Sequence, residues 1–212
     1  MPPCPRKDII DPDVVGIYHC VSRCVRRALL CGLDALTGQC FDHRKDWLEQ
    51  ATARLAALFA IDVLDFCVLS NHIHHVLRNR PDIVEKWSDE EVVRRWWQIC
   101  PKRKEPDGSP SEMTEAELQM QLSDKGLVQE LRGRLSSISW FMKILKEPVA
   151  KRANLEDEVT GFFWDGRFRS IRLLDSAAVL ACSIYVDLNM IRAGQAKTPE
   201  DSRYTSAWHR IQ

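Results

Sequence analysis

Two apolar segments separated by a short polar turn constrain the fold of this chain most strongly. Residues 61–69 are apolar and partly β-branched, and residues 72–78 have the composition of a second strand. Ser70 and Asn71 between them are typical turn residues. The pattern predicts a β-hairpin, and the segments on either side of it then decide which fold contains it.

The segments around the hairpin complete a βαββαβ order. Further strands are expected at 14–22 and 168–174, with a short one at 28–31, and amphipathic helices at 43–60 and 127–150. This order predicts an α+β fold of the ferredoxin-like type, an antiparallel sheet with helices on one face. The other face, or one edge of the sheet, is left for a ligand.

Residues 81–126 differ from the rest of the chain and predict an insertion. They contain the acidic run Asp89–Glu91, the pair Trp96–Trp97 and the proline-bounded segment Pro101–Pro110. We expect short helices and one loop here rather than a second domain. Residues 1–212 are thus predicted to form a single domain with a helical insertion at about 81–126.

The composition is that of an ordinary globular protein. Hydrophobic residues make up 45% and charged residues 28% of the 212 residues. No apolar run approaches the ~20 residues that a membrane helix needs, and residues 1–12 lack the apolar core of a signal peptide. None of the 8 cysteines forms a Cys-x-x-Cys pair, the usual zinc spacing. We therefore expect a cytoplasmic protein with no membrane partner.

The formal net charge is zero, so composition alone does not indicate a nucleic-acid partner. The charges are nevertheless segregated along the chain. Basic residues cluster at 23–27 and 167–172, whereas acidic residues gather at 82–91 and 112–130. The clusters predict a local basic face, although ordinary solvated charge explains them equally well.

The segment Asn71–Val76 carries the strongest chemical signal. Residues two apart in a strand point to the same face, so His72 and His74 are expected to project side by side. Two such imidazoles can hold one divalent metal and leave positions open for substrate oxygens. His75 would face the opposite way. The triplet is weak evidence by itself, because most H-x-H triplets bind nothing and unrelated metal enzymes also use it.

A helix predicted from Ser176 to about Ile191, capped by Asp175 or Ser176 and ended by Gly194, carries a polar stripe. Tyr185, Asn189 and Arg192 lie on it at i, i+4 and i+7. A phenol can act as a nucleophile and form a covalent intermediate where a metal polarises the electrophile. A half-buried structural tyrosine with its hydroxyl bonded nearby is the alternative.

Aromatic and arginine residues are interleaved in the segment Phe162–Ser170. Such a segment can stack bases and grip phosphates, and it makes Trp164, Arg167 and Arg169 candidates for DNA contacts. A hydrophobic turn that enters a strand explains the same residues equally well.

Four motifs, in this order, resemble the REP-associated and insertion-sequence-type single-tyrosine transposases, a branch of the HUH endonucleases. They span Ile17 to Gly194 apart from the insertion, which is long for the family. The matching segments are Ile17–Arg23 (IYHCVSR), Leu69–His74 (LSNHIH), Trp164–Phe168 (WDGRF) and Tyr185–Gly194 (YVDLNMIRAG).

The resemblance implies a role for several matching residues. His72 and His74 correspond to the metal-binding pair, Tyr185 to the nucleophile, and Asn189 to a polar residue that can complete the metal shell. The expected metal is Mg²⁺ or Mn²⁺, and manganese should bind more tightly in vitro because imidazole is not a preferred ligand of magnesium. The expected DNA contacts are Arg23, Trp164, Arg167, Arg169 and Arg192.

The resemblance also implies a reaction and a substrate. The family acts on single-stranded DNA next to hairpins, forms a 5′-phosphotyrosine link and frees a 3′-hydroxyl that can later rejoin strands. We thus expect a metal-dependent DNA nickase and strand transferase. Some relatives are dimers that exchange the tyrosine helix and the REP-associated branch acts as monomers. We expect a monomer and leave a dimer open.

Two functions of other classes stay open. One is a non-catalytic, transposase-derived module that binds nucleic acid, and the other is a metal hydrolase unrelated to DNA. The sequence favours catalysis because the histidine pair, Tyr185 and Asn189 are all present. A hydrolase would have no need of Tyr185, so the position of that residue relative to His72 and His74 discriminates between them.

Overall fold

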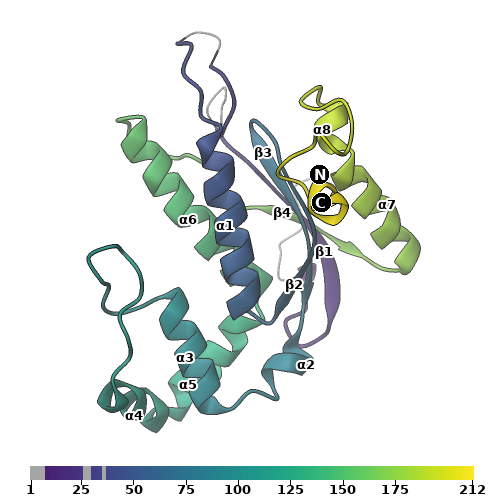
Figure 1. Ribbon diagram of the computed structural model, residues 1–212. Coiled ribbons are helices and arrows are strands. Elements are labelled where there is room, and N and C mark those ends of the chain that lie inside the picture. Colours follow the sequence, from purple (N-terminus) through teal and green to yellow (C-terminus); the bar gives the residue numbers. More distant parts are fainter. Residues whose placement is uncertain (1–7, 26–29, 35–36) are drawn as a thin grey trace.

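A four-stranded antiparallel sheet organises the computed structural model, which describes residues 8–25, 30–34 and 37–212 (Figure 1). The strands are β1 (Gly16–Arg23), β2 (Ile61–Val68), β3 (His72–Asn79) and β4 (Arg169–Leu173). Their order across the sheet is β2-β3-β1-β4, and every neighbouring pair is antiparallel. Helix α1 (His43–Leu58) follows β1, and α6 (Ile138–Glu156) precedes β4. The predicted α+β class and its βαββαβ order are confirmed.

The main hydrophobic core lies between the sheet and the helices α1 and α6, which cover one face of it (Figure 1). Tyr18 of β1 and Ile73 and Leu77 of β3 point into this core, where they meet Leu55 of α1 and Phe141 of α6. All five side chains are fully buried. Alternate residues of β1 and β3 therefore face the opposite side of the sheet.

Two further helices, α7 (Ser176–Asp187) and α8 (Asn189–Arg192), pack on that opposite face (Figure 1). A second, smaller core joins them to the sheet and consists of Cys67, Leu69, Val76, Val186 and Met190. The face that the sequence left open for a ligand is thus partly covered. The short helix α9 (Ser206–Ile211) lies against β2, where the Ser206 hydroxyl accepts a hydrogen bond from the Phe66 N–H at 2.9 Å.

The helix after β4 begins and ends at the predicted residues but is divided. The Asp175 side chain caps it by accepting from the Ala178 N–H, and Gly194 follows it with a φ of 68°. Leu188, with ψ near 2°, separates α7 from α8. Tyr185 and Asn189 consequently stand on two successive helices rather than on one continuous stripe.

Residues 81–126, predicted as an insertion, contain the helices α2 (Pro81–Val84), α3 (Asp89–Ile99) and α4 (Glu115–Ser123), and α5 (Lys125–Leu135) begins where they end. In Figure 1 α3, α4 and α5 gather at one end of α1, away from the sheet. The single helix predicted at residues 127–150 is wrong, because α5 ends at Leu135 and α6 begins at Ile138. Ser137 explains the break, since its hydroxyl caps α6 by accepting from the Trp140 N–H.

Two other sequence predictions concern a short strand and membrane-spanning helices. The short strand predicted at residues 28–31 lies partly outside the described residues, and Leu30 and Cys31 form bends. Of the helices in the described ranges, none has both the length and the apolar character needed to cross a membrane.

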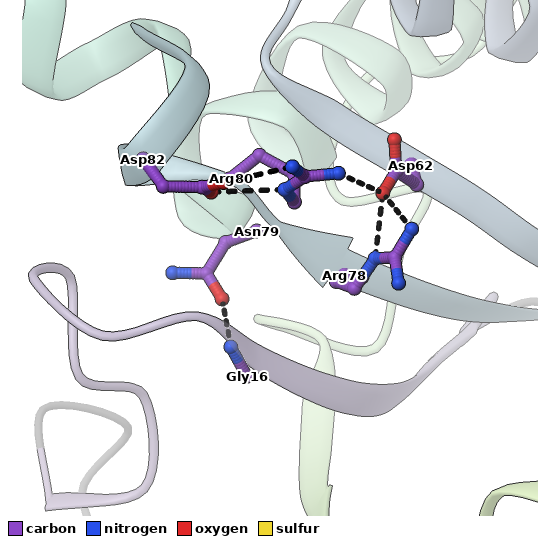
Figure 2. Close-up of polar contacts among 6 residues, drawn as sticks. All are labelled: Gly16, Asp62, Arg78, Asn79, Arg80 and Asp82. Carbon is purple, nitrogen blue, oxygen red and sulfur yellow. Dashed lines mark hydrogen bonds and ion pairs between the residues drawn. The ribbon is translucent and has the colours of Figure 1, made fainter. Parts of the chain in front are cut away.

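Asn79 anchors the N-terminal segment to the end of β3 (Figure 2). Its amide oxygen accepts a hydrogen bond from the Gly16 N–H at 2.8 Å, and its amide nitrogen donates to the Val14 carbonyl at 3.0 Å. The side chain is 1% exposed. Gly16 is tightly confined, because a Cβ there would lie 2.6 Å from the Tyr18 hydroxyl oxygen. The start of β1 is therefore fixed by buried polar contacts as well as by the sheet.

A charged network beside Asn79 holds the exit from the hairpin (Figure 2). The Asp62 carboxylate accepts hydrogen bonds from Arg78 at 2.6 Å and from Arg80 at 3.4 Å. Arg80 also forms a bidentate pair with Asp82 at 2.9 and 2.7 Å. Because these groups are only partly buried, they orient the chain more than they stabilise it.

Replacing Asn79 with Ala should lower the free energy of unfolding by about 1–3 kcal/mol, because it leaves the N–H of the buried Gly16 without its side-chain partner. Urea denaturation measures the change. The matched control is Gln119→Ala, which removes an exposed amide that donates to Glu115. The control should change stability by less than about 0.5 kcal/mol, and equal losses in both variants would contradict the anchoring role.

Candidate functional site

The register of β1 against β3 brings the candidate residues together on the sheet face that α7 covers. Arg23 lies opposite His72, and Val21 lies opposite His74. His19, two residues before Val21, points to the same face. His72, His74 and His19 thus form one group, with the first two from β3 and the third from β1.

The three imidazoles are in close contact. The ring centroids of His72 and His74 are 4.8 Å apart, and those of His74 and His19 are 5.1 Å apart with an interplanar angle of 14°. His19 Nε2 and His74 Nδ1 lie 2.8 Å apart and share a hydrogen bond. His74 is only 3% exposed. His19 could not be selected from the sequence alone, because its contact with His74 depends on the register of β1 against β3.

Hydrogen bonding leaves ring nitrogens of the pair available to a ligand. His72 Nδ1 lies 2.5 Å from the Asn71 side-chain oxygen, which can only accept, so Nδ1 carries the proton and Nε2 the lone pair. Nε2 of His74 is buried and has no hydrogen-bond partner among the described residues. A buried nitrogen of this kind is rare in proteins unless it meets a ligand or an ordered water.

Burial keeps the group uncharged. It lowers the pKa of His74 to about 3, reinforced by the neighbouring imidazoles of His19 and His72. Burial and then the Arg23 charge lower the pKa of His72, and burial lowers that of His19. At neutral pH the three rings are therefore neutral, and neutral imidazole is the form that binds metals.

His75 faces the other side of the sheet, as the strand alternation predicts. It is fully buried, its Nε2 lies 3.2 Å from the Thr52 hydroxyl, and its ring stacks on Phe66 at 6.3 Å. These contacts belong to the core beside α1, so His75 is separated from the pair.

Tyr185 of α7 lies beside the histidines of its own chain. Its ring centroid is 5.7 Å from that of His74 and 6.1 Å from that of His19, in edge-on geometry. The side chain is 39% exposed, and the Arg192 guanidinium stands 5.4 Å from its ring. The tyrosine therefore borders both the buried imidazoles and solvent. Asn189, 7% exposed, has an amide nitrogen with no hydrogen bond in the described ranges.

Three predicted DNA contacts line one small hollow next to the pair. Arg23, Arg167 and Arg169 surround a space of about 150 Å³ together with Val21 and Asp165. All three arginines are exposed, and within the described part of the chain none of them forms an ion pair. A concentration of unneutralised guanidinium groups attracts phosphates.

Trp164 is placed differently from what an exposed stacking residue requires. It is 7% exposed, and its indole N–H donates to the Lys146 carbonyl at 2.9 Å. Phe162, two residues earlier, is 86% exposed instead. The interleaved pattern indicated aromatic residues at this surface but did not reveal which of them is buried.

Comparison with known proteins finds a similarity in fold and none in sequence. No family model matches the chain, and no curated protein is similar to it in sequence. A solved structure of a REP-associated tyrosine transposase bound to a REP hairpin is similar in fold, with 13% identity and a TM-score of 0.49. The similarity covers 92% of this chain and 78% of that one.

The hydrogen bond from His72 to Asn71 predicts one tautomer. Long-range proton–nitrogen NMR correlation should show His72 with its proton on Nδ1 at neutral pH, because the amide oxygen accepts it there. Asn71→Ala should give a mixture of both tautomers. A wild-type His72 that carries its proton on Nε2 would contradict the assignment.

Proposed function

We propose that this chain is a metal-dependent DNA nickase and strand transferase in which Tyr185 is the nucleophile. The observation that carries the proposal is the position of Tyr185, whose ring lies 5.7 Å from the buried, neutral His74 on its own chain. A water-using metal hydrolase needs no phenol at this place. The second sheet face, between β3 and α7, is then the reaction site.

The residues present suit a divalent metal such as Mg²⁺ or Mn²⁺. His72 and His74 offer Nε2 lone pairs on one side of the strand, and that of His74 is buried without a partner among the described residues. Within the ranges that the structure describes, no set of three or more His, Cys, Asp or Glu side chains is arranged to hold an ion. The shell would therefore need Asn189 and substrate oxygens, and a bound metal would supply charge stabilisation at the phosphate.

His19 and Asn71 act as positioning residues in this proposal. A metal on His74 Nε2 requires the proton of that ring on Nδ1, from which it is donated to His19 Nε2 at 2.8 Å. Asn71 fixes His72 in the corresponding tautomer. Both imidazoles of the pair are thus held in the tautomer that leaves Nε2 free for a ligand.

The chemical step is a transesterification. The Tyr185 oxygen attacks the phosphorus of a DNA phosphodiester and loses its proton, while the bond from phosphorus to the 3′-oxygen breaks. The 3′-oxygen leaves as a hydroxyl after taking up a proton, and a 5′-phosphotyrosine link stores the bond energy for rejoining. Helix α7 fixes the direction of attack, because Val186 next to the tyrosine is buried in the second core.

The DNA would reach the site over the exposed arginines. Arg23 lies opposite His72 in the sheet, and Arg167 and Arg169 line the adjoining hollow. Arg192 stands beside the tyrosine ring. We infer single-stranded or hairpin DNA as the substrate. We also expect a monomer, because Tyr185 lies at the histidines of its own chain, and we expect it in the cytoplasm, as the sequence predicts.

Tyr185→Phe should abolish the covalent adduct and lower cleavage by on the order of 10³-fold or more, because it removes the attacking oxygen. The assay incubates the protein with hairpin-containing single-stranded DNA and Mn²⁺ and resolves the adduct on a denaturing gel. Tyr204→Phe is the control, since its hydroxyl donates to Asp46 at 3.0 Å. It should retain the adduct.

An adduct formed by Tyr185→Phe would show that another residue is the nucleophile. Cleavage without an adduct in the wild type would identify a water-using nuclease. Binding of hairpin DNA with neither cleavage nor adduct would support the second candidate, a nucleic-acid-binding module, which the unpaired arginines favour independently.

Mn²⁺ binding should depend on the histidine pair. We expect His74→Ala to weaken it by at least the roughly 10–100-fold that loss of an outer-shell partner costs. Electron paramagnetic resonance of free Mn²⁺ follows the titration. His209→Ala, which removes an exposed imidazole beside Glu49, should bind as the wild type does. Unchanged affinity in a His72→Ala, His74→Ala double variant would contradict the proposed site.

A further inference from the structure

A groove of about 640 Å³ lies between α6 and the segment that leads into β4. This volume is within the range of roughly 300–1,000 Å³ that is usual for small-molecule sites. Much of its wall is aromatic and is formed by Trp140, Phe162, Phe163, Trp164 and Phe168. Phe162 at its edge is 86% exposed. A flat ring presented to solvent in this way suits a planar partner better than it suits the core.

Cationic groups line the same groove. The Lys143 ammonium stands 4.5 Å from the Trp140 ring centroid, and Arg167 is exposed and forms no ion pair within the described residues. The carboxylate of Glu147 also lines the groove but is paired with Lys151 at 2.6 Å. Positive charge beside aromatic faces is the combination with which proteins bind single-stranded nucleic acid.

The groove is continuous with the candidate active site through Arg167. That residue lines both the groove and the smaller hollow that contains Arg23 and Arg169. Arg23 in turn lies opposite His72 on β1. Exposed guanidinium groups therefore connect the histidine pair to the aromatic wall, and the three arginines that line the hollow outnumber its one carboxylate, that of Asp165.

We propose that this groove binds unpaired nucleotides of single-stranded DNA adjoining the strand that enters the active site. The base of one nucleotide stacks on Phe162 and Trp140, and the adjoining backbone phosphates lie at Lys143 and Arg167. Trp164 forms the floor, since its indole N–H is already bonded to the Lys146 carbonyl. The proposal rests on the proposed function for the identity of the substrate, and charge complementarity selects a polyanion over an apolar small molecule.

The test compares two hairpin DNAs by fluorescence anisotropy, one blunt and one with a single-stranded extension of about 12 nucleotides. Phe162→Ala and Lys143→Ala should each weaken binding of the extended DNA by about tenfold and leave the blunt hairpin unchanged. Leu155→Ala is the control for Phe162, because Leu155 is 81% exposed on the same α6 but outside the groove. Lys125→Ala serves the same purpose for Lys143.

A 2-aminopurine probe at successive positions of the extension reports stacking directly. The wild type should quench one or two positions, and Phe162→Ala should restore their fluorescence. Equal affinity of the wild type for both hairpins would overturn the proposed role of the groove. So would a Phe162→Ala variant that binds the extension and quenches its fluorescence as the wild type does. An RNA extension of the same sequence that bound more tightly through Phe162 would overturn DNA as its occupant.

Failure of this proposal is distinguishable from failure of the proposed function. If the adduct depends on Tyr185 but Phe162→Ala and Lys143→Ala leave the affinity unchanged, the groove proposal fails and the proposed enzymatic function stands. If binding of the extension depends on Phe162 but no adduct forms, the groove proposal is supported and the proposed catalysis is contradicted.

Discussion

The antiparallel register of β1 against β3 is the constraint on which the candidate site depends. It sets Arg23 opposite His72 and Val21 opposite His74, and it brings His19 within hydrogen-bond distance of His74. A slip of one residue in β3 would turn the histidine pair into the main core and expose Ile73. The buried contacts of Asn79 with the start of β1 oppose such a slip, because they fix the same register at the other end of the two strands.

The second core then decides which groups of α7 and α8 are buried and which meet solvent. Val186 and Met190 attach these helices to β2 and β3, so the adjacent Tyr185 is left half-exposed beside His74. The pairing of charged side chains also differs between regions of the molecule. Arginines near the hairpin exit and in the insertion are paired with carboxylates, such as Arg80 with Asp82, whereas Arg167 near the site is unpaired among the described residues. A chain of zero net charge can thus carry a basic face.

Local patterns predicted the parts of the fold that local physics determines. The period of two in residues 72–78 gave the side-by-side histidines and the opposite orientation of His75, because alternation in a strand needs no partner. The apolar spacing predicted one continuous helix across Ser136 and Ser137, which is wrong. The Ser137 cap starts a new helix there, although the apolar periodicity continues. The contact of His19 with His74 and the burial of Trp164 depend on register and on loop packing, which a single sequence does not encode locally. The roles expected of Tyr185, His72 and His74 rest on the resemblance of four ordered motifs to a known family, and local patterns alone do not predict them.

The proposed function depends on one step, the attack of Tyr185 on DNA at the histidine pair. The most direct measurement is peptide mapping by mass spectrometry of the protein after incubation with single-stranded hairpin DNA and Mn²⁺. If Tyr185 is the nucleophile, a nucleotide remnant will be linked through its 5′-phosphate to the peptide that contains Tyr185, and the released strand will carry a free 3′-hydroxyl. A remnant on any other residue, or DNA cut with no peptide modified, would contradict it.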